Sequence, residues 1–394
     1  MFNKQLIQQF LQIKTPCYYY DTGLLLKTLF AIKSAASLYN FQLHYAIKAN
    51  ANSKILKSIS EEGFGADCVS GNEIILALNT GFHPNRIVFA GVGKTDDEIL
   101  LAIEKNIFCI NAESLQELEV INHLASGLNK KVRIALRINP DIDAHTHQHI
   151  TTGLHDNKFG LSWCDVEYFM QHKEDYQNLI VDGVHFHIGS QITRMQVFSD
   201  LCYVVNQVLD DLAKNKMYIQ HINMGGGLGI NYAEPESQIP DFQTYFDIFH
   251  QKMKIKTGQI VHFEPGRAIV GQSGALITRV LYVKENGDRK TIIVDAGFTE
   301  LLRPALYQAK HKIVNLTNEN NYMLYDIAGP VCETSDYFGK SILLPETTRG
   351  DLLAIYSTGA YGEVMASQYN LRQPAEKYFS EDFHEKHAEI LNNS

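Results

Sequence analysis

The chain lacks several features that mark common protein classes. No apolar run reaches the roughly 18 residues of a membrane-spanning helix. The N-terminal stretch MFNKQLIQQFLQIK is interrupted by glutamines and has no apolar core of a signal peptide. Lys and Arg number 35 against 44 Asp and Glu, a net charge of −9 with no basic stripe. These absences predict a cytoplasmic protein with neither a nucleic-acid nor a membrane partner.

Cysteine is also scarce, and its spacing is scattered. No CxxC pair occurs among the 6 cysteines, so neither a disulfide framework nor a zinc ribbon is expected. The rest of the composition is ordinary: 394 residues, of which 45% are hydrophobic and 20% charged. This length and composition exclude intrinsic disorder and allow one large domain or two to three smaller ones.

Apolar runs bounded by turn residues alternate with stretches of helical period up to about residue 266. Helices are predicted, for example, at 53–63, 72–81, 95–106 and 242–256. This alternation favours parallel strands, and eight units in about 240 residues match a (β/α)8 barrel. A doubly wound sheet is the alternative. The predicted strands are 43–49, 65–70, 86–91, 107–111, 131–139, 183–190, 218–227 and 259–266.

The pattern of predicted secondary structure changes after about residue 270, where short predicted strands follow one another. Residues 275–297 resemble a hairpin with Asn-Gly-Asp as its turn. The strand-like segment 15–21 precedes the barrel and is a candidate to pair with this region. The expected fold is therefore α/β, a (β/α)8 barrel with a second, mostly-β C-terminal domain. The predicted domains are 23–270 for the barrel, and 1–22 plus 271–394 for the β domain.

Catalytic groups of such a barrel come from the C-terminal ends of its strands. The glycines after the seventh strand allow backbone N–H groups to approach an anion closely, although a plain tight turn is the alternative. Barrels often bind phosphate with the loops after strands seven and eight. The candidate groups at the strand ends are Lys48, Asp67, Arg137, His185, His187, Ser190, Gly225, Gly226, Gly227, Glu264, Gly266 and Arg267.

Lys48 lies in an otherwise apolar predicted strand. A lysine there is costly unless it is paired or chemically used, or unless it extends outward to water. Together with a phosphate site, a barrel lysine suggests a Schiff base to pyridoxal 5'-phosphate. Glu264 would then pair with the nitrogen of the cofactor ring, and the flat ring of His187 would stack on the cofactor.

Histidines offer a different reading of the same barrel. His145, His147 and His149 form either a metal cluster or a solvated loop, and His185 and His187 share one strand face. A metal-dependent barrel hydrolase would use such residues. In the β domain, Cys332 is either a small core residue or a loop thiol, and Tyr361 lies in a glycine-flanked loop.

Taken together, the motifs resemble the fold-type III decarboxylases that depend on pyridoxal phosphate, from about residue 15 to 380. The matching segments are Tyr45-Ala-Ile-Lys48-Ala-Asn50, His185-Phe-His187-Ile-Gly-Ser190, Met224-Gly-Gly-Gly227, Glu264-Pro-Gly-Arg267, Arg303-Pro-Ala-Leu-Tyr307, Cys332-Glu333 and Gly359-Ala-Tyr-Gly362. One departure is visible, because Cys-Glu-Thr-Ser-Asp replaces the more usual Cys-Glu-Ser-x-Asp. The change keeps a hydroxyl and leaves only the fit of that loop in question.

The resemblance implies a role for each matching residue. Lys48 would be the Schiff-base lysine, His187 would stack on the cofactor ring, and Glu264 would hold its nitrogen. Cys332 would return a proton to the substrate carbon, and with Glu333 it would reach the active site of the partner subunit in a homodimer. The cofactor would also contact Asp67, Arg137, Ser190, Gly225, Gly226, Gly227, Gly266, Arg267 and Tyr361, and the substrate would contact Arg267, Arg303, Tyr307, Glu333 and Tyr361.

The implied reaction is the conversion of meso-2,6-diaminopimelate to L-lysine and carbon dioxide, the last step of bacterial lysine biosynthesis. This substrate carries an amino acid group at each end, so its far end needs a cation for the carboxylate and an anion for the ammonium. Arg303 and Glu333 supply one of each, and arginine suits bidentate carboxylate binding. Ornithine, arginine and carboxynorspermidine decarboxylases remain alternatives.

Overall fold

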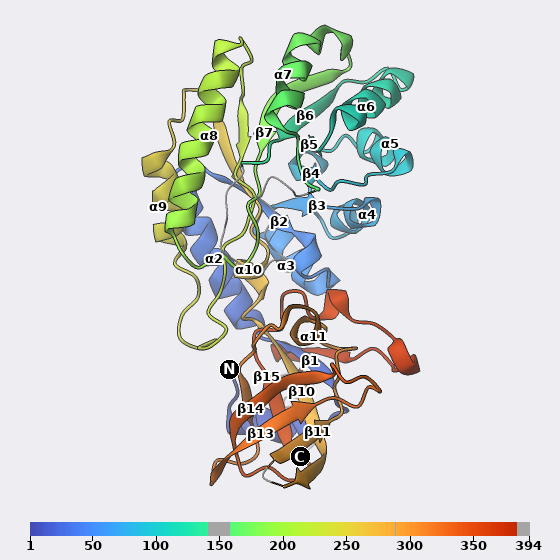
Figure 1. Ribbon diagram of the computed structural model, residues 1–394, viewed down its shortest axis with the longest axis vertical. Coiled ribbons are helices and arrows are strands. Elements are labelled where there is room, and N and C mark those ends of the chain that lie inside the picture. Colours follow the sequence, from blue (N-terminus) through green and yellow to red (C-terminus); the bar gives the residue numbers. More distant parts are fainter. Residues whose placement is uncertain (141–157, 288, 384–394) are drawn as a thin grey trace, which may run out of the picture. The chain divides into compact units, whose positions relative to one another are not determined.

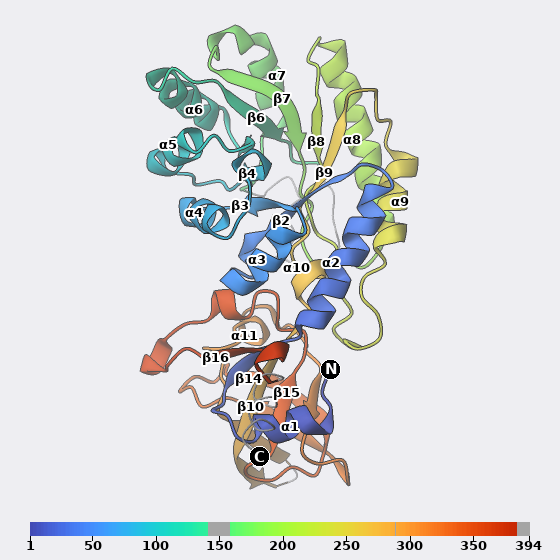
Figure 2. The ribbon, with the colours of Figure 1, turned by 180° about the vertical axis from the view of Figure 1, so that it is seen from behind.

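The computed structural model describes residues 1–140, 158–287 and 289–383. By its contacts the chain divides into two compact units, whose elements are labelled in Figure 1 and seen from behind in Figure 2. We call Leu29–Gly229 with Pro240–Gly266 the barrel unit, and Met1–Thr28, Ile230–Ile239 and Arg267–Ser394 the β unit. Segments 23–28, 230–239 and 267–270 thus group with the β unit, and the domain boundaries expected from the sequence stay a prediction.

The barrel unit contains a closed barrel of eight parallel strands, which confirms the predicted fold class. Each strand pairs with the next along the chain, and β2 pairs with β9 to close the ring. The strands are β2 (Gln42–Ala46), β3 (Gly65–Cys68), β4 (Ile87–Phe89), β5 (Cys109–Ala112), β6 (Val132–Arg137), β7 (Leu179–His185), β8 (His221–Asn223) and β9 (Ile260–Phe263).

Helices alternate with these strands as the sequence pattern predicted. Side chains at their N-termini set where they begin: α5 starts at a capping box between Thr95 and Glu98, and α7 at one between Ser162 and Asp165. Helix α2 (Thr22–Ser37) was not predicted. The others are α3 (Ser53–Glu61), α4 (Gly71–Asn79), α5 (Asp96–Glu104), α6 (Leu115–Gly127), α7 (Trp163–Gln171), α8 (Gln196–Lys214) and α9 (Phe242–Lys252), with short 3-10 turns η1 (Ile47–Ala49), η2 (Pro84–Arg86) and η4 (Lys173–Asp175).

The β unit is built on a sheet of eight strands in which β10 is central. The predicted hairpin is confirmed as the antiparallel pair β10–β11, although Asp288 of its turn lies outside the described residues. The predicted strand near the N-terminus is β1, which pairs antiparallel with β10 and parallel with β16. The strands are β1 (Cys17–Tyr20), β10 (Gly274–Asn286), β11 (Arg289–Val294), β12 (Ile313–Asn315), β13 (Tyr322–Ala328), β14 (Tyr337–Pro345), β15 (Leu352–Ile355) and β16 (Glu376–Phe379).

Short helices complete the β unit. Helix α1 (Lys4–Phe10) buries Leu6 and Phe10 against a core that includes Tyr19, Ile277 and Phe383. The remaining elements are α10 (Arg267–Val270), α11 (Arg303–Tyr307) and the 3-10 turns η5 (Glu363–Met365) and η6 (Tyr369–Leu371). Because α11 begins at Arg303, its single turn places Tyr307 four residues further along the same helix.

Three buried histidines form a hydrogen-bonded chain inside the barrel. His44 Nε2 lies 2.9 Å from His262 Nδ1, and His262 Nε2 lies 3.0 Å from His221 Nδ1. His44 Nδ1 lies 3.0 Å from the carbonyl oxygen of Arg86. Burial lowers the pKa of each of the three, to about 4 for His44. These three histidines are therefore uncharged at neutral pH.

Acid is expected to destabilise the barrel through these histidines. An unfolded histidine takes up a proton near pH 6.5, whereas folded His44 does so only near pH 4, so stability falls as the pH falls between these values. His44 alone contributes ~3 kcal/mol to this loss. Denaturant midpoints measured from pH 7.5 to 4.5 should fall less steeply for His44→Gln than for wild type. The exposed His83→Gln serves as the control, and an equal slope for His44→Gln would contradict the account.

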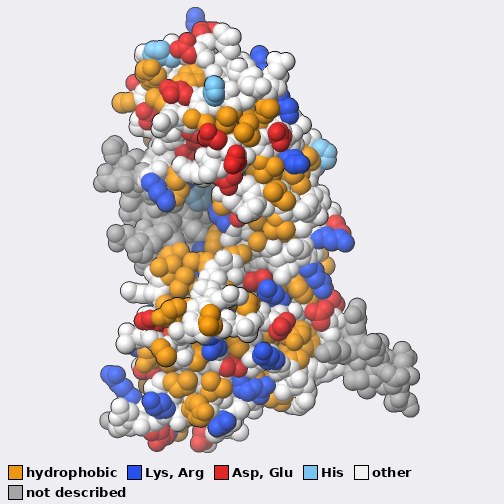
Figure 3. All heavy atoms as spheres, turned by 90° about the vertical axis from the view of Figure 1, so that its right-hand side faces the viewer, with side chains coloured by type: hydrophobic (Ala, Val, Ile, Leu, Met, Phe, Trp, Pro, Cys, Tyr) orange, Lys and Arg blue, Asp and Glu red, His pale blue; other side chains and the backbone are white. Residues whose placement is uncertain are grey.

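The surface carries charges of both signs. Figure 3 shows Lys and Arg side chains interspersed with Asp and Glu over the visible face. Among the helices that the structure describes, none is both long and apolar enough to cross a membrane.

Candidate active site

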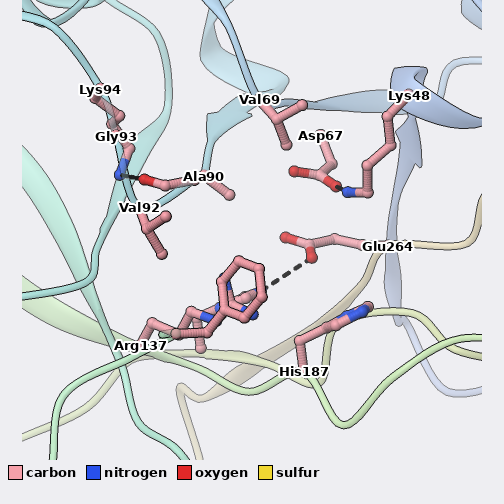
Figure 4. Close-up of a pocket in the computed structure, with 13 residues that line it drawn as sticks. Lys48, Asp67, Val69, Ala90, Val92, Gly93, Lys94, Arg137, His187 and Glu264 are labelled. Atoms are coloured by element: carbon pink, nitrogen blue, oxygen red, sulfur yellow. Dashed lines mark hydrogen bonds and ion pairs between the residues drawn. The ribbon is translucent and has the colours of Figure 1, made fainter. Parts of the chain in front are cut away.

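The C-terminal ends of several barrel strands surround one cavity of about 370 Å³. Figure 4 shows Lys48, Asp67 and Glu264 converging on it. Lys48 lies in the 3-10 turn η1 directly after β2, and not in the strand as predicted. The turn begins because Ala46 ends the strand ladder, and it presents the lysine at the end where barrels hold reactive groups. The lining residues are Lys48, Asp67, Val69, Ala90, Gly91, Val92, Gly93, Lys94, Arg137, Phe159, His185, His187 and Glu264.

Lys48 and Asp67 form an ion pair at this cavity. The Nζ–Oδ2 distance is 2.6 Å, and Asp67 is fully buried while the Lys48 side chain is 35% exposed. Burial and then Glu264 raise the pKa of Asp67 to about 6, with Lys48 opposing them. Asp67 Oδ1 is buried and has no hydrogen-bond partner among the described residues. The pair thus places one accessible amine beside a carboxylate that has capacity for a further polar contact.

Glu264 provides a second buried carboxylate, directly after β9. Its Oε2 accepts a hydrogen bond from His185 Nε2 at 2.9 Å, and its Oε1 accepts one from Asn223 Nδ2 at 2.6 Å. Burial raises the pKa of Glu264. His185 and then Lys48 lower this pKa by more than burial raises it, so the net pKa lies below the ordinary value. Glu264 is therefore ionised at neutral pH and offers a fixed negative charge to a cationic ring nitrogen.

His187 lies two residues beyond the end of β7. Its Nδ1 accepts a hydrogen bond from the backbone N–H of Gly226 at 3.4 Å. Burial, and then the positive charges of Arg137 and Lys48, hold the pKa of His187 well below its usual range. The ring is therefore neutral and flat at the cavity wall, which suits contact with a planar aromatic group.

Arg137 lines the cavity, but its charge is already paired. Its Nη1 donates to Glu113 Oε1 at 2.6 Å, and its guanidinium lies 4.6 Å from the ring centroid of Phe159. Glu113 also accepts the backbone N–H groups of Gly91 and Gly160. Arg137 and Glu113 thus hold the cavity wall together, and a cofactor contact of Arg137 stays a prediction.

The glycines after β8 are required by close packing of the backbone. A Cβ atom on Gly225 would lie 2.2 Å from the carbonyl oxygen of Phe186, and one on Gly226 would lie 2.2 Å from that of Glu264. The loop that contains Ser190 runs beside them, because Ile192 N–H donates to the Gly227 carbonyl. Close packing of the backbone thus accounts for glycine at these positions without a ligand, in line with the tight-turn alternative. Contact of these glycines with phosphate stays a prediction.

The β unit brings three further candidates together. Arg267 and Arg303 both donate to the hydroxyl of Tyr232, at 2.6 and 2.8 Å. The Arg267 guanidinium lies 4.7 Å from the ring centroid of Tyr361. Both arginines are buried, and Tyr307 on α11 is half-buried. Two neighbouring buried cations form a strong site for an anion.

Cys332 and Glu333 lie on an exposed loop of the β unit. The backbone N–H of Cys332 donates to Asn370 Oδ1, and Glu333 Oε1 accepts a hydrogen bond from the hydroxyl of Tyr369 at 2.8 Å. In the described residues no hydrogen bond or ion pair joins Glu333 to Arg303.

Gly266 packs closely on β2 and η1, where a Cβ atom on it would lie 3.1 Å from Ala46.

The metal alternative receives no support from the described histidines. His185 is bound to Glu264, and no group of three or more His, Cys, Asp or Glu side chains in the described ranges is placed to hold a metal ion. His145, His147 and His149 lie outside those ranges.

Sequence reasoning missed several residues of these sites. Glu113 directly follows β5 and lies two residues beyond the predicted strand 107–111, so the strand-end rule that found Lys48 would have found it too. Lys94 lies in a loop, and Asn223 is the last residue of a short strand. Tyr232 and His311, which both contact Arg303, have no local signal. Tyr232 lies 71 residues from Arg303, and His311 lies eight residues from Arg303 and 45 from its other partner, Tyr356.

A closed parallel barrel with a lysine and two buried carboxylates in its cavity has the groups that an enzyme using pyridoxal phosphate needs, an amine for the Schiff base and an anion for the ring nitrogen. Comparison with known proteins agrees. The family described as "Pyridoxal-dependent decarboxylase, pyridoxal binding domain" matches residues 27–271, and the chain belongs to this family of pyridoxal phosphate-dependent decarboxylases. The predicted family, fold and cofactor are thereby confirmed.

The individual relatives are more specific. A diaminopimelate decarboxylase of Bacteroides thetaiotaomicron is 52% identical over 378 residues, 95% of this chain and 98% of the relative. That of Aquifex aeolicus is 39% identical over 96% of this chain and 89% of its own length. A crystal structure of the Helicobacter pylori diaminopimelate decarboxylase with L-lysine superimposes with a TM-score of 0.90 and 39% identity, covering 95% of this chain and 94% of that one.

Proposed function

We propose that this chain removes carbon dioxide from one end of meso-2,6-diaminopimelate and releases L-lysine, the final step of bacterial lysine biosynthesis. The observation that carries the proposal is the 52% identity to a diaminopimelate decarboxylase over nearly the full length of both chains. The product L-lysine is the ligand in the Helicobacter pylori structure. We also propose a cytoplasmic location, because the proposed role is biosynthetic.

The residues of the barrel cavity fit pyridoxal phosphate. Lys48 supplies a partly exposed amine, and the ionised Glu264 supplies a partner for a protonated ring nitrogen. Asp67 Oδ1 and His185 Nδ1 are buried polar atoms without partners in the described structure, as expected of a site that binds a polar ligand. Bound pyridoxal phosphate supplies a ring that takes up the electron pair left when the carboxylate departs.

Residues of this chain would bind and orient the cofactor. Lys48 attaches the cofactor, Glu264 keeps its ring nitrogen protonated, and His187 supports the ring face. We assign the phosphate group to Ser190, Gly225, Gly226, Gly227, Gly266, Arg267 and Tyr361. Asp67 holds Lys48 in position, and Arg137 holds the cavity wall through Glu113. Both residues remain candidates for cofactor contact.

The substrate's far end needs a cation and an anion. We assign its carboxylate to Arg303 and its ammonium to Glu333, with Arg267, Tyr307 and Tyr361 as further substrate contacts. Arg303 is buried, so its charge is little screened by water and favours a carboxylate strongly. Discrimination against ornithine follows, because ornithine lacks the distal carboxylate.

We further propose a homodimer in which each active site receives Cys332 and Glu333 from the partner subunit. Both side chains are exposed on the single chain and lie next to each other on one loop. Cys332 would deliver a proton to the carbon that has lost the carboxylate.

Reduction with borohydride tests the use of Lys48. The protein with pyridoxal phosphate should be yellow, and borohydride should bleach it and fix the cofactor to the peptide containing Lys48. The label should disappear in Lys48→Ala. It should remain in Lys94→Gln, because Lys94 also lines the cavity but its Nζ is bound to Glu117 at 2.5 Å. Recovery of the label on any lysine other than Lys48 would overturn the assignment.

A further inference from the structure

The loop after β8 carries a tyrosine into the β unit. Residues 230–239 group with that unit, and Gln272 Nε2 holds the loop by donating to the carbonyls of Pro235 and Gln238 at 2.9 and 3.0 Å. Gln272 itself is buried. Tyr232 is therefore presented from a loop that is fastened at two points.

The hydroxyl oxygen of Tyr232 is shared by two arginines. Arg267 Nη1 and Arg303 Nη1 donate to it at 2.6 and 2.8 Å, and the Arg303 guanidinium also lies 4.9 Å from the Tyr232 ring centroid. Each arginine is 5% exposed. Two buried like charges repel, and a phenol oxygen with a ring face offsets part of that repulsion. Tyr232 thus fixes the spacing of the two guanidinium groups.

His311 also holds Arg303, at the same Nη1 that binds Tyr232. Its Nδ1–H donates to the carbonyl of Tyr356 at 2.8 Å, so its Nε2 accepts from Arg303 Nη1 at 2.9 Å. Burial, and then the charge of Arg303, lower the pKa of His311 to about 3. His311 therefore stays neutral near pH 7, where its acceptor lone pair is available to Arg303. The His311 and Tyr232 rings also meet edge to face at 5.0 Å.

These contacts leave one part of Arg303 for a ligand. Nη1 is occupied by both Tyr232 and His311, whereas Nε is buried with no partner in the described structure. Guanidinium groups bind carboxylates through two parallel N–H donors of one edge. The edge that contains Nε is therefore the one left for a carboxylate.

We propose that Tyr232 and His311 are positioning residues that fix the Nε edge of Arg303 for the distal carboxylate of the substrate, and so determine selectivity for a substrate that carries one. The inference rests on the proposed function, in which Arg303 binds that carboxylate. Neither side chain is required to touch the substrate, and both act through the orientation of Arg303.

Binding to the holoenzyme tests this role without turnover. Calorimetry compares L-lysine, which has the carboxylate, with 1,5-diaminopentane, which lacks it. In Tyr232→Phe we expect the affinity for L-lysine to fall about 10- to 100-fold, the effect of a lost hydrogen bond to a charged group. The affinity for the diamine should not change. His311→Phe should behave alike, and His311→Gln, which restores an acceptor, should recover part of the loss.

Kinetics and a control variant complete the test. The KM for diaminopimelate should rise in Tyr232→Phe with little change in kcat and in cofactor content. Tyr322→Phe, an exposed tyrosine of the same unit, should match wild type. Unchanged L-lysine affinity in Tyr232→Phe, or equal losses for both ligands, would overturn the positioning role. A wild-type enzyme inactive on diaminopimelate would contradict the proposed function instead, and the two ligands would still test the geometry of Arg303.

Discussion

Replacing Cys332 by alanine is expected to slow turnover by about 10²–10⁴-fold while pyridoxal phosphate stays bound, because a positioned proton donor contributes a factor of that size. Cys332 is exposed on its loop, so its side chain is accessible to a partner subunit. Steady-state rates and the absorbance of the cofactor measure the two halves of this prediction. Cys164 is also exposed, and Cys164→Ala is the matched control that should retain full activity.

Subunit mixing tests whether Cys332 acts in the partner's site. Inactive Lys48→Ala and Cys332→Ala subunits are mixed and allowed to exchange. In a shared-site dimer, a heterodimer has one site with both defects and one intact site, so equal mixing should restore about a quarter of wild-type activity. If the subunits demonstrably exchange and the mixture stays inactive, each subunit uses its own cysteine or Cys332 has only a structural role.

Replacing Arg303 by alanine is expected to raise the KM for diaminopimelate by about 10²- to 4 × 10³-fold, because loss of the guanidinium leaves the charge of the substrate carboxylate uncompensated at a cost of about 3–5 kcal/mol. Arg303 is buried and presents a free Nε, so no solvent or neighbouring cation replaces it easily. Initial rates over a range of diaminopimelate concentrations provide the measurement.

A control separates this effect from a change in overall charge. Arg349→Ala removes an exposed arginine of the same unit, whose guanidinium lies over the ring of Tyr282, and should leave the KM unchanged. An unchanged KM in Arg303→Ala would show that the carboxylate is held elsewhere.

Local sequence patterns were sufficient to predict the barrel and much of its cavity. Eight apolar runs alternating with helical stretches predict a closed barrel, and all eight are strands of that barrel. Lys48 stood out because a lysine near the end of an apolar run is unusual, and Glu264 because it lies near the end of the eighth run. The same rule, applied to the fourth run, would have identified Glu113, which pairs with Arg137.

The residues that sequence reasoning missed depend on contacts between distant segments. Tyr232 meets Arg303, 71 residues away, and His311 is fixed by the carbonyl of Tyr356, 45 residues away. No periodicity or spacing encodes such pairs. Lys48 was placed in the strand itself, whereas the strand ladder ends at Ala46 and a 3-10 turn follows, because apolar character alone does not show where hydrogen bonding between strands stops.

The release of carbon dioxide from a set of amino acids tests the central claim most directly. The purified chain, supplied with pyridoxal phosphate, is incubated separately with meso-2,6-diaminopimelate, L-ornithine, L-arginine and L-lysine. The account predicts rapid release from diaminopimelate, with one equivalent of L-lysine formed, and little from the other three, which each carry one carboxylate and so have none for the distal site when that one reacts. Release from ornithine as fast as from diaminopimelate, or a diamine as the main product, would contradict it.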